Sequence, residues 1–347
     1  MKHPISIAVL YNKPAARFAK DASHIEAEDD TEHSAIEVCD ALREKGARAE
    51  LVPVTETDID AVVDHIDADM AFNLIEWTGV DTPYAMTTFD RLNARNILYT
   101  GATKQNYLDS CDKTRIKAMV DAIGLPTAPW QAFVTGNEPV SATVVYPSIV
   151  KVSLEHSSVG IETDSIVRNP EELIRVVKKR IAEYKQPVFA EAFLTGREFQ
   201  VTVLETNDGP TVLPPAEIVY AKGTDVPLLT YESRWDETDA EYNNSIVAVA
   251  TLAPELETRL KTISLTAFQT LGFRDYARFD VRCDADEHPY FLELNSNPGL
   301  GDDEEYGMTL SYKAVGMTFA DFIWEIVQSA LRRNNAKLSL HDLSKKA

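Results

Sequence analysis

The sequence predicts an α/β protein built from three lobes. Its 347 residues, 44% of them hydrophobic, are enough to bury more than one core, so we expect two or three domains. In the N-terminal third, short apolar runs alternate with a helical pattern, which is typical of a parallel sheet covered by helices. Towards the C-terminus, two runs of alternating apolar residues flank a polar turn, which indicates an antiparallel hairpin.

The first lobe is predicted to be an α/β substrate domain at residues 1–112. Ile5–Leu10 is almost continuously apolar, as expected for a strand buried on both faces. Apolar residues at helical spacing follow from Glu32, and Gly46 is placed to end that helix. The next strands are predicted at Ala49–Val54 and Met70–Leu74, which gives the βαβ order of a parallel sheet.

The central lobe is predicted at residues 113–197 and the last lobe at residues 198–347. In the central lobe, Asn169 precedes Pro170, which predicts a capped helix over Pro170–Tyr184. The last lobe is predicted to hold the helices Pro254–Leu271 and Phe319–Leu331. The polar tail after Asn334 is expected to fray.

Composition excludes several classes of protein. A formal net charge of −21 argues against a general nucleic-acid surface. The three cysteines lack metal-ligand spacing, and their odd number predicts reduced thiols in a cytoplasmic protein. No run approaches the about 20 apolar residues of a membrane span, and the N-terminal apolar run is too brief for a signal peptide.

The most informative motif is the C-terminal hairpin. Tyr276–Arg282 and Pro289–Leu294 are predicted to pair through the turn Asp284–Glu287. Residues two apart on a strand share a face, so three oxygen donors can converge there: Asp280, Glu293 and Asn295. Such a set suits Mg²⁺. The alternative is a polar hairpin with solvated carboxylates, but the apolar residues around Glu293 make an unbound carboxylate costly.

Several segments, in chain order, resemble the ATP-grasp superfamily in its D-alanine–D-alanine ligase branch. The hairpin with its Glu-Leu-Asn-Ser-Asn-Pro-Gly continuation resembles the metal-binding signature of that family. The resemblance covers residues 99–316. The other matching segments are Ser110–Lys117 with Gly124–Pro126, Tyr146–Lys151, Glu155–Gly160, Glu191–Glu198, Leu213–Glu217 and Tyr231–Trp235.

The resemblance implies a role for each matching residue. It assigns the metal to Asp280, Glu293 and Asn295, and the ATP phosphates to Lys113 and Lys151 with the loop residues Ser157, Ser158 and Gly160. It assigns adenine to Glu191, Ala192, Phe193 and Leu194, and ribose to Glu198. It assigns transition-state charge to Arg278 and the Gly299 amide, with Arg234 near the γ-phosphate where the family has lysine.

The implied function is an ATP-dependent carboxylate–amine ligase that acts through an acylphosphate on small amino-acid or amine substrates. The implied ligands are ATP and Mg²⁺, two ions, with Mn²⁺ as a substitute, and the nucleotide lies between the central and C-terminal lobes. A homodimer that binds neither nucleic acid nor membranes is expected. The alternatives are a true D-alanine–D-alanine ligase, an ATP-grasp kinase and a non-catalytic nucleotide-binding regulator.

The chain departs from the family pattern at the substrate end. Tyr11–Pro14 replaces a glycine- and serine-rich signature, and the family's ammonium-binding glutamate is not assignable, with Glu26, Glu28 and Glu32 as weak candidates. Asn73–Trp77 replaces a His-Gly segment, and His156 replaces a lid glycine. The acidic run Asp302–Glu305 is either a solvated loop or the lining of an acceptor pocket that favours amine-rich acceptors.

Overall fold

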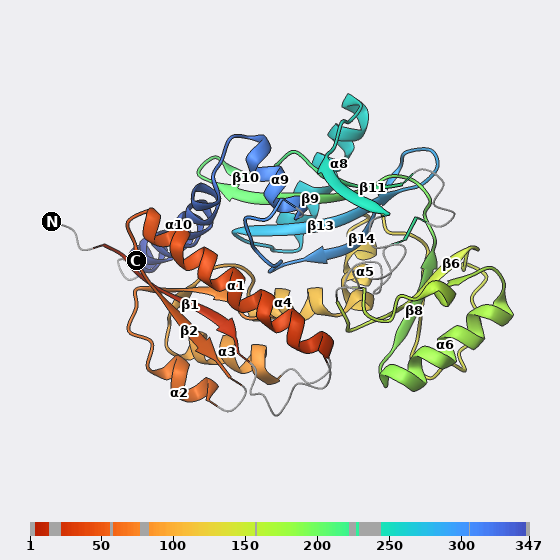
Figure 1. The fold of residues 1–347 in the computed structure, drawn as a ribbon, viewed down its shortest axis with the longest axis horizontal. Helices are drawn as coiled ribbons and strands as arrows, with labels where there is room; N and C mark the ends of the chain where they lie inside the picture. Colours follow the sequence, from red (N-terminus) through yellow and green to blue (C-terminus); the bar gives the residue numbers. More distant parts are fainter. Residues whose placement is uncertain are drawn as a thin grey trace.

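The computed structural model describes residues 4–13, 22–55, 58–76, 83–156, 158–221, 227–228, 244–304 and 306–344. Figure 1 shows three lobes, with the N-terminal lobe and the green central lobe on either side of a large C-terminal sheet. No helix in these ranges is long and apolar enough to cross a membrane. The domain boundaries at residues 112 and 197 stay predictions.

The first sheet has the strand order β2-β1-β3-β4, and its strands run parallel as predicted. The strands are β1 (Ser6–Asn12), β2 (Arg48–Val54), β3 (Met70–Leu74) and β4 (Leu98–Tyr99). Alternate residues of β1 enter two different cores: Ile7 and Val9 face one cluster, and Ala8 and Leu10 face another. Burial on both faces explains why the strand reads as a continuous apolar run.

Helices cover both faces of this sheet. They are α1 (Ala22–Glu44), α2 (Ile59–Asp64), α3 (Pro83–Ala94) and α4 (Lys104–Cys111). The helix predicted from Glu32 is confirmed and begins earlier than expected, and Gly46 follows it at a φ of +84°. This left-handed conformation costs glycine no steric strain, so Gly46 turns the chain back towards β2.

The central lobe is a small antiparallel sheet with one long helix on it. Its strand order is β5-β8-β6-β7. The prediction for α6 (Pro170–Tyr184) is confirmed at both ends, and the side chain of Asn169 accepts a hydrogen bond from the Glu172 amide. The strands are β5 (Trp130–Phe133), β6 (Ser148–Val152), β7 (Ile166–Val167) and β8 (Val188–Ala192).

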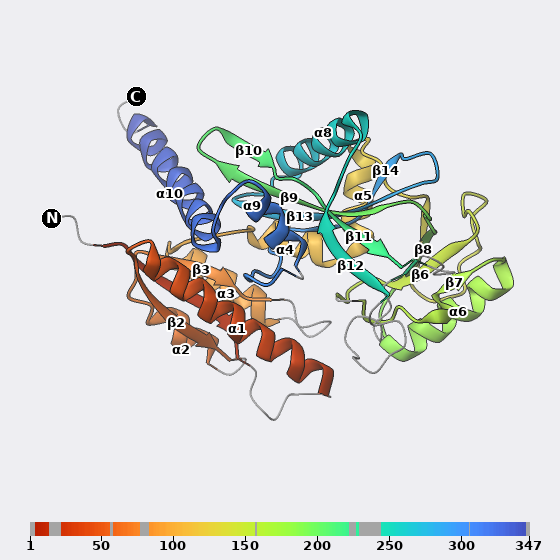
Figure 2. The same cartoon turned by 45° about the horizontal axis from the view of Figure 1, so that its top comes forward.

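The third sheet, in the C-terminal lobe, has six strands among the described residues. Its main path is β12-β11-β9-β13-β14, and β10 pairs with β9. The strands are β9 (Glu198–Thr206), β10 (Gly209–Val212), β11 (Ala216–Tyr220), β12 (Ser245–Val249), β13 (Tyr276–Cys283) and β14 (Pro289–Asn295). The helices around it are α5 (Lys113–Ala122), α8 (Pro254–Thr270) and α9 (Gly307–Ala314). Figure 2 shows α8 and α5 on the side of this sheet away from the N-terminal lobe.

The last helix differs from its prediction. It was expected to end at Leu331 and fray after Asn334, but α10 runs from Phe319 to Ser344. The tail contains Ala, Lys and Leu and no Gly or Pro, so helix propensity carries it beyond the buried stretch. The predicted apolar face is confirmed, because its residues are buried against the first sheet and α1: Phe322, Ile323, Ile326, Val327 and Ala330.

Candidate active site

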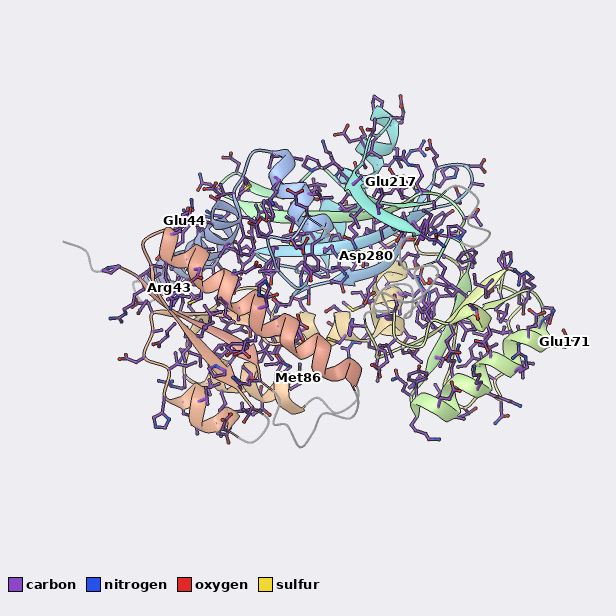
Figure 3. All side chains as sticks on the ribbon, in the orientation of Figure 1. Arg43, Glu44, Met86, Glu171, Glu217 and Asp280 are labelled. Carbon is purple, nitrogen blue, oxygen red and sulfur yellow. The ribbon has the colours of Figure 1, made fainter. Side chains whose placement is uncertain are left out.

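The predicted hairpin is confirmed, with β13 and β14 antiparallel. Asp280 lies opposite Glu293 and Arg278 lies opposite Asn295, with a register shift just after Asp280. Arg278 holds Asp280 in a fork, with Nε 2.9 Å from Oδ1 and a second guanidinium nitrogen 3.1 Å from Oδ2. Asn295 donates to the same carboxylate at 3.3 Å. Figure 3 places Asp280 near the middle of the molecule, far from Glu171 at the outer end of α6.

Glu293 is the centre of a second group of contacts. Its Oε1 lies 2.6 Å from Lys113 Nζ and 3.2 Å from His156 Nδ1. Burial alone would raise the pKa of Glu293, but the Lys113 ammonium and His156 hold that pKa well below its usual range. Burial and the Lys113 ammonium lower the pKa of His156, and its Nδ1 lies within hydrogen-bond distance of the Glu293 carboxylate.

The hairpin residues fit a hard divalent cation. Asp280, Glu293 and Asn295 offer carboxylate and amide oxygens, the donors that Mg²⁺ takes. Each carboxylate is paired with a positive side chain: Asp280 with Arg278, and Glu293 with Lys113. No three His, Cys, Asp or Glu side chains within the described ranges form a metal cluster, because the third donor here is an asparagine.

Glu191 lies in a buried cluster with two lysines. Its carboxylate oxygens are 2.6 Å from Lys117 Nζ and 2.8 Å from Lys151 Nζ. The side chain of Glu191 is 1% exposed, that of Lys117 2% and that of Lys151 14%. Burial would raise the pKa of Glu191, but the two lysines lower it overall. This placement changes the role we propose for Glu191, from contact with adenine to orientation of the lysines.

The predicted adenine hinge follows Glu191 on β8. The amide of Ala192 donates to the Pro129 carbonyl and that of Phe193 to the Pro147 carbonyl, each at 2.9 Å. The Leu194 amide makes no backbone hydrogen bond to any described residue. Glu198, predicted to bind ribose, accepts from the Tyr220 hydroxyl at 2.9 Å and pairs with Arg282 at 3.0 Å.

The predicted phosphate loop follows β6. Ser158 and Gly160 both adopt positive φ, +64° and +77°. Left-handed residues in a loop can point neighbouring backbone N–H groups into one anion-binding concavity. A Cβ on Gly160 would lie 2.9 Å from a Val152 methyl, so only glycine fits there. Ser157 and Arg234 lie outside the described residues.

The Gly299 loop is tied to the first lobe. Asn297 donates to the Asn73 carbonyl at 3.0 Å, and the Tyr276 hydroxyl donates to Asn297 Oδ1 at 3.3 Å. A Cβ on Gly101 would lie 2.1 Å from Asn297 Oδ1, so this close approach requires glycine. The loop that carries Gly299 is therefore fixed by contacts from two lobes.

A polar cavity of about 300 Å³ opens beside the acidic loop. It is lined by His33, Ser34, Glu37, Gly301, Asp302, Asp303 and Tyr306. The Asp302 amide donates to Glu37 Oε2 at 3.1 Å, which joins the loop to α1. Lys313 partly neutralises the loop, because its Nζ is 3.1 Å from Asp302 and 3.3 Å from Glu304. Glu305 and the side chains of Glu26 and Glu28 lie outside what the structure describes.

The structure places two residues in this region for which the sequence predicted no role. Lys117 lies one helical turn after Lys113 on α5, at the end of the matching segment Ser110–Lys117. Glu76 follows β3 and reaches the Gly299 loop. A signal for Glu76 exists in the sequence, because ligands of parallel sheets bind beyond the carboxyl ends of their strands.

Comparison with protein families gives one match that covers more than half of the chain. The model described as "D-ala D-ala ligase C-terminus" matches residues 119–328.

Individual relatives agree with this match. Uncharacterized protein y4sG of Sinorhizobium fredii is 31% identical over 265 residues, which cover 76% of this chain and 75% of that protein. A D-alanine–D-alanine ligase of Acinetobacter baumannii is 28% identical over 298 residues, 85% of this chain and 89% of that enzyme.

Solved structures show the same fold. The D-alanine–D-alanine ligase from Bacillus anthracis, complexed with ATP, superposes with a TM-score of 0.72 at 21% identity. The match covers 96% of this chain and 99% of that one. The three-lobed arrangement predicted for the chain is therefore confirmed.

Proposed function

This chain belongs to the D-ala D-ala ligase family and is an ATP-dependent carboxylate–amine ligase, and from that premise we propose which residues carry the reaction and what amine it takes. A substrate carboxylate oxygen attacks the γ-phosphorus of ATP and ADP leaves. An amine then attacks the carbonyl carbon of the acylphosphate, a C–N bond forms and inorganic phosphate leaves. The observation that carries the proposal is the meeting of Arg278, Asp280, Glu293 and Asn295 on one hairpin.

At the phosphate end, we assign Lys113 and Lys151 to the ATP phosphates as positive point charges. The turned amides around Ser158 and Gly160 supply further donors, with Ser157 and Arg234 proposed from the resemblance alone. Asp280, Glu293 and Asn295 would hold Mg²⁺ or Mn²⁺, which supplies charge stabilisation to a phosphoryl group in transfer. In this proposal a phosphate takes the place of Glu293, whose Oε1 lies 2.6 Å from Lys113 Nζ.

At the nucleoside end, we assign the Leu194 amide and the hinge backbone of Ala192 and Phe193 to adenine, and Glu198 to ribose. Glu191 holds Lys117 and Lys151 in place instead of contacting the base. Because Glu191 is buried, its charge strengthens the orientation of both lysines without exposing a negative group to ATP.

At the reacting carbon, we assign Arg278 and the Gly299 amide to the oxygen that becomes negative when the amine attacks. Donors aimed at a developing charge are worth about 3–4 kcal/mol each to an acyl-transfer barrier. This pair favours the ligase over the kinase alternative, because phosphoryl transfer to a hydroxyl creates no tetrahedral carbon. A non-catalytic regulator would not need it either.

For the acceptor, we propose an amine without a carboxylate close to its nitrogen. The cavity beside the loop is lined by Glu37, Asp302 and Asp303, and such a lining repels an anion. D-alanine is the substrate named for the relatives, and its carboxylate disfavours it as acceptor here. A true D-alanine–D-alanine ligase is accordingly the second candidate.

The resemblance also supports a cytoplasmic homodimer that binds neither nucleic acid nor membranes. Light scattering of the purified protein measures its oligomeric state, and a gel-shift with duplex DNA measures binding to nucleic acid.

The test is product formation with ATP and Mg²⁺ across a matrix of D- and L-amino acids and amines, read by ADP release and product mass. A mass equal to acid plus amine minus water establishes the ligase and names both substrates. D-alanyl-D-alanine as the preferred product would replace our acceptor proposal with the second candidate. A phosphorylated hydroxyl would establish the kinase.

A further inference from the structure

Glu76 is held rigidly at the carboxyl edge of the first sheet. It follows β3, and its backbone is clamped by Asn12 at the end of the neighbouring β1. The Glu76 amide donates to Asn12 Oδ1 at 2.7 Å, and Asn12 Nδ2 donates to the Glu76 carbonyl at 3.2 Å. Asn12 is itself buried, so this pair of bonds fixes the point from which the Glu76 side chain extends.

The Glu76 carboxylate reaches the residue assigned to the oxyanion. A Cβ on Gly299 would lie 3.5 Å from Glu76 Oε1, so the carboxylate stands directly over this exposed glycine. The two segments are tied by the bond from Asn297 to the Asn73 carbonyl. Burial disfavours the charged form of Arg278, but Asp280, Glu293 and Glu76 together raise its pKa, which places Glu76 within electrostatic reach of the guanidinium.

A carboxylate at this point suits a positive ligand. The acyl carbon must lie within reach of the Gly299 amide, and the attacking nitrogen must lie beside that carbon. An alkylamine at neutral pH is an ammonium ion, which has no lone pair and cannot attack. A carboxylate in contact with it both binds the cation and removes the proton.

We propose that Glu76 binds the ammonium group of the acceptor and accepts its proton, an assignment that rests on the ligase function above. One proton passes from the ammonium to the Glu76 carboxylate, and the freed lone pair forms the C–N bond. The electrons of the C=O bond move to the oxygen held by Arg278 and Gly299. When they return, the C–O bond to phosphate breaks, the second nitrogen proton leaves with the phosphate, and Glu76 releases its proton to water.

The test compares a cationic acceptor with a neutral one in Glu76→Gln. The cationic probe is the amine found in the substrate matrix, and the neutral probe is hydroxylamine, paired with the same acid and read as hydroxamate. With the amine, kcat/KM should fall about 100-fold or more, the range of a lost general base. With hydroxylamine it should stay within about threefold, because this nucleophile attacks without first losing a proton to Glu76. The KM for ATP should not change.

Two variants complete the experiment. Glu50→Gln removes the same charge from an exposed position on β2 and should leave both reactions unchanged. Glu76→Asp keeps the carboxylate and should recover at least about tenfold of the amine reaction over Glu76→Gln.

Equal losses with the amine and with hydroxylamine would overturn the proposal and make Glu76 a structural residue. A rise in the KM of the acid alone would overturn it in favour of binding the acid's own ammonium. Failure of the wild type to make hydroxamate from any acid would overturn the ligase function itself, which is a separate result.

Discussion

Two lysine–glutamate clusters lie in the proposed nucleotide region, and they differ in formal charge. Around Glu191, two lysines share one buried carboxylate, so the formal charge of the cluster is +1. Around Glu293, one lysine and one histidine share one carboxylate, so the formal charge is zero with the histidine counted as neutral. The side chains of Glu293 and Lys113 are 20% and 10% exposed, against 1% and 2% for Glu191 and Lys117.

The difference suits the two clusters to different roles. The pairing around Glu191 is fixed, and the pairing around Glu293 is the one that can exchange partners. Lys151 has the surplus charge of the first cluster and the partial exposure to meet a phosphate without leaving Glu191. Lys113 Nζ donates to Glu293 and to the Glu155 carbonyl, and in the proposed exchange a phosphate takes the place of Glu293, which frees that carboxylate for a cation. Burial of the first cluster makes its pairing hard to lose, whereas the second is open enough to change partners.

The largest effect is expected at the exchangeable cluster. Glu293→Gln removes the carboxylate assigned to the cation, so turnover should fall about 1,000-fold or more, by analogy with lost electrostatic groups in other enzymes. ADP release measures the loss, and urea denaturation should show a smaller loss of stability than at Glu191, because the side chains of Glu293 and Lys113 are more exposed. Wild-type turnover in this variant would contradict the metal assignment.

At the fixed cluster, the expected effect is on stability. Glu191→Gln leaves the buried Lys117 without a counter-charge, so the free energy of unfolding should fall by about 3–5 kcal/mol. Urea denaturation followed by circular dichroism gives this value. The double variant Glu191→Gln with Lys117→Met removes the uncompensated charge and should recover part of it. A single variant as stable as the wild type would show that Lys117 does not depend on Glu191.

A variant of Arg278, which pairs with Asp280 on the hairpin, tests acyl transfer separately from nucleotide binding. Arg278→Ala should lower kcat by about 100- to 1,000-fold while the KM for ATP stays unchanged. Steady-state kinetics at saturating Mg²⁺ measures both constants, and Arg278→Lys tests whether charge without the fork is enough. An equal loss of ATP affinity would move Arg278 to the nucleotide site.

The smallest effect is expected at the acidic loop, because the loop is proposed to select the acceptor and not to bind ATP. The variant combines four substitutions: Asp302→Asn, Asp303→Asn, Glu304→Gln and Glu305→Gln, the last outside the described residues. It should shift the kcat/KM ratio between a diamine and a neutral-tailed amine by about tenfold. ATP binding, measured by calorimetry, should not change. Unchanged selectivity would return the run to the solvated-loop interpretation.

Local signals in the sequence predicted much of the fold. The hairpin at Tyr276–Asn295 follows from alternation around a polar turn, and α6 follows from Asn169 and Pro170, because such preferences act between residues close in the chain. The prediction for the end of α10 was wrong, because it ended the helix where the apolar face ends. The helix propensity of the polar residues that follow continues it to Ser344.

What the sequence by itself determined is the set of reactive groups and the strands that carry them, since side-chain type and period are properties of the chain. Only the tertiary structure decided which groups meet. Lys117 and Lys151 reach Glu191 because α5 packs beside the pairing of β6 with β8, and Glu76 reaches Gly299 because two lobes are joined through Asn297. Such contacts depend on packing between distant segments, where charge pairing is strong because water is excluded.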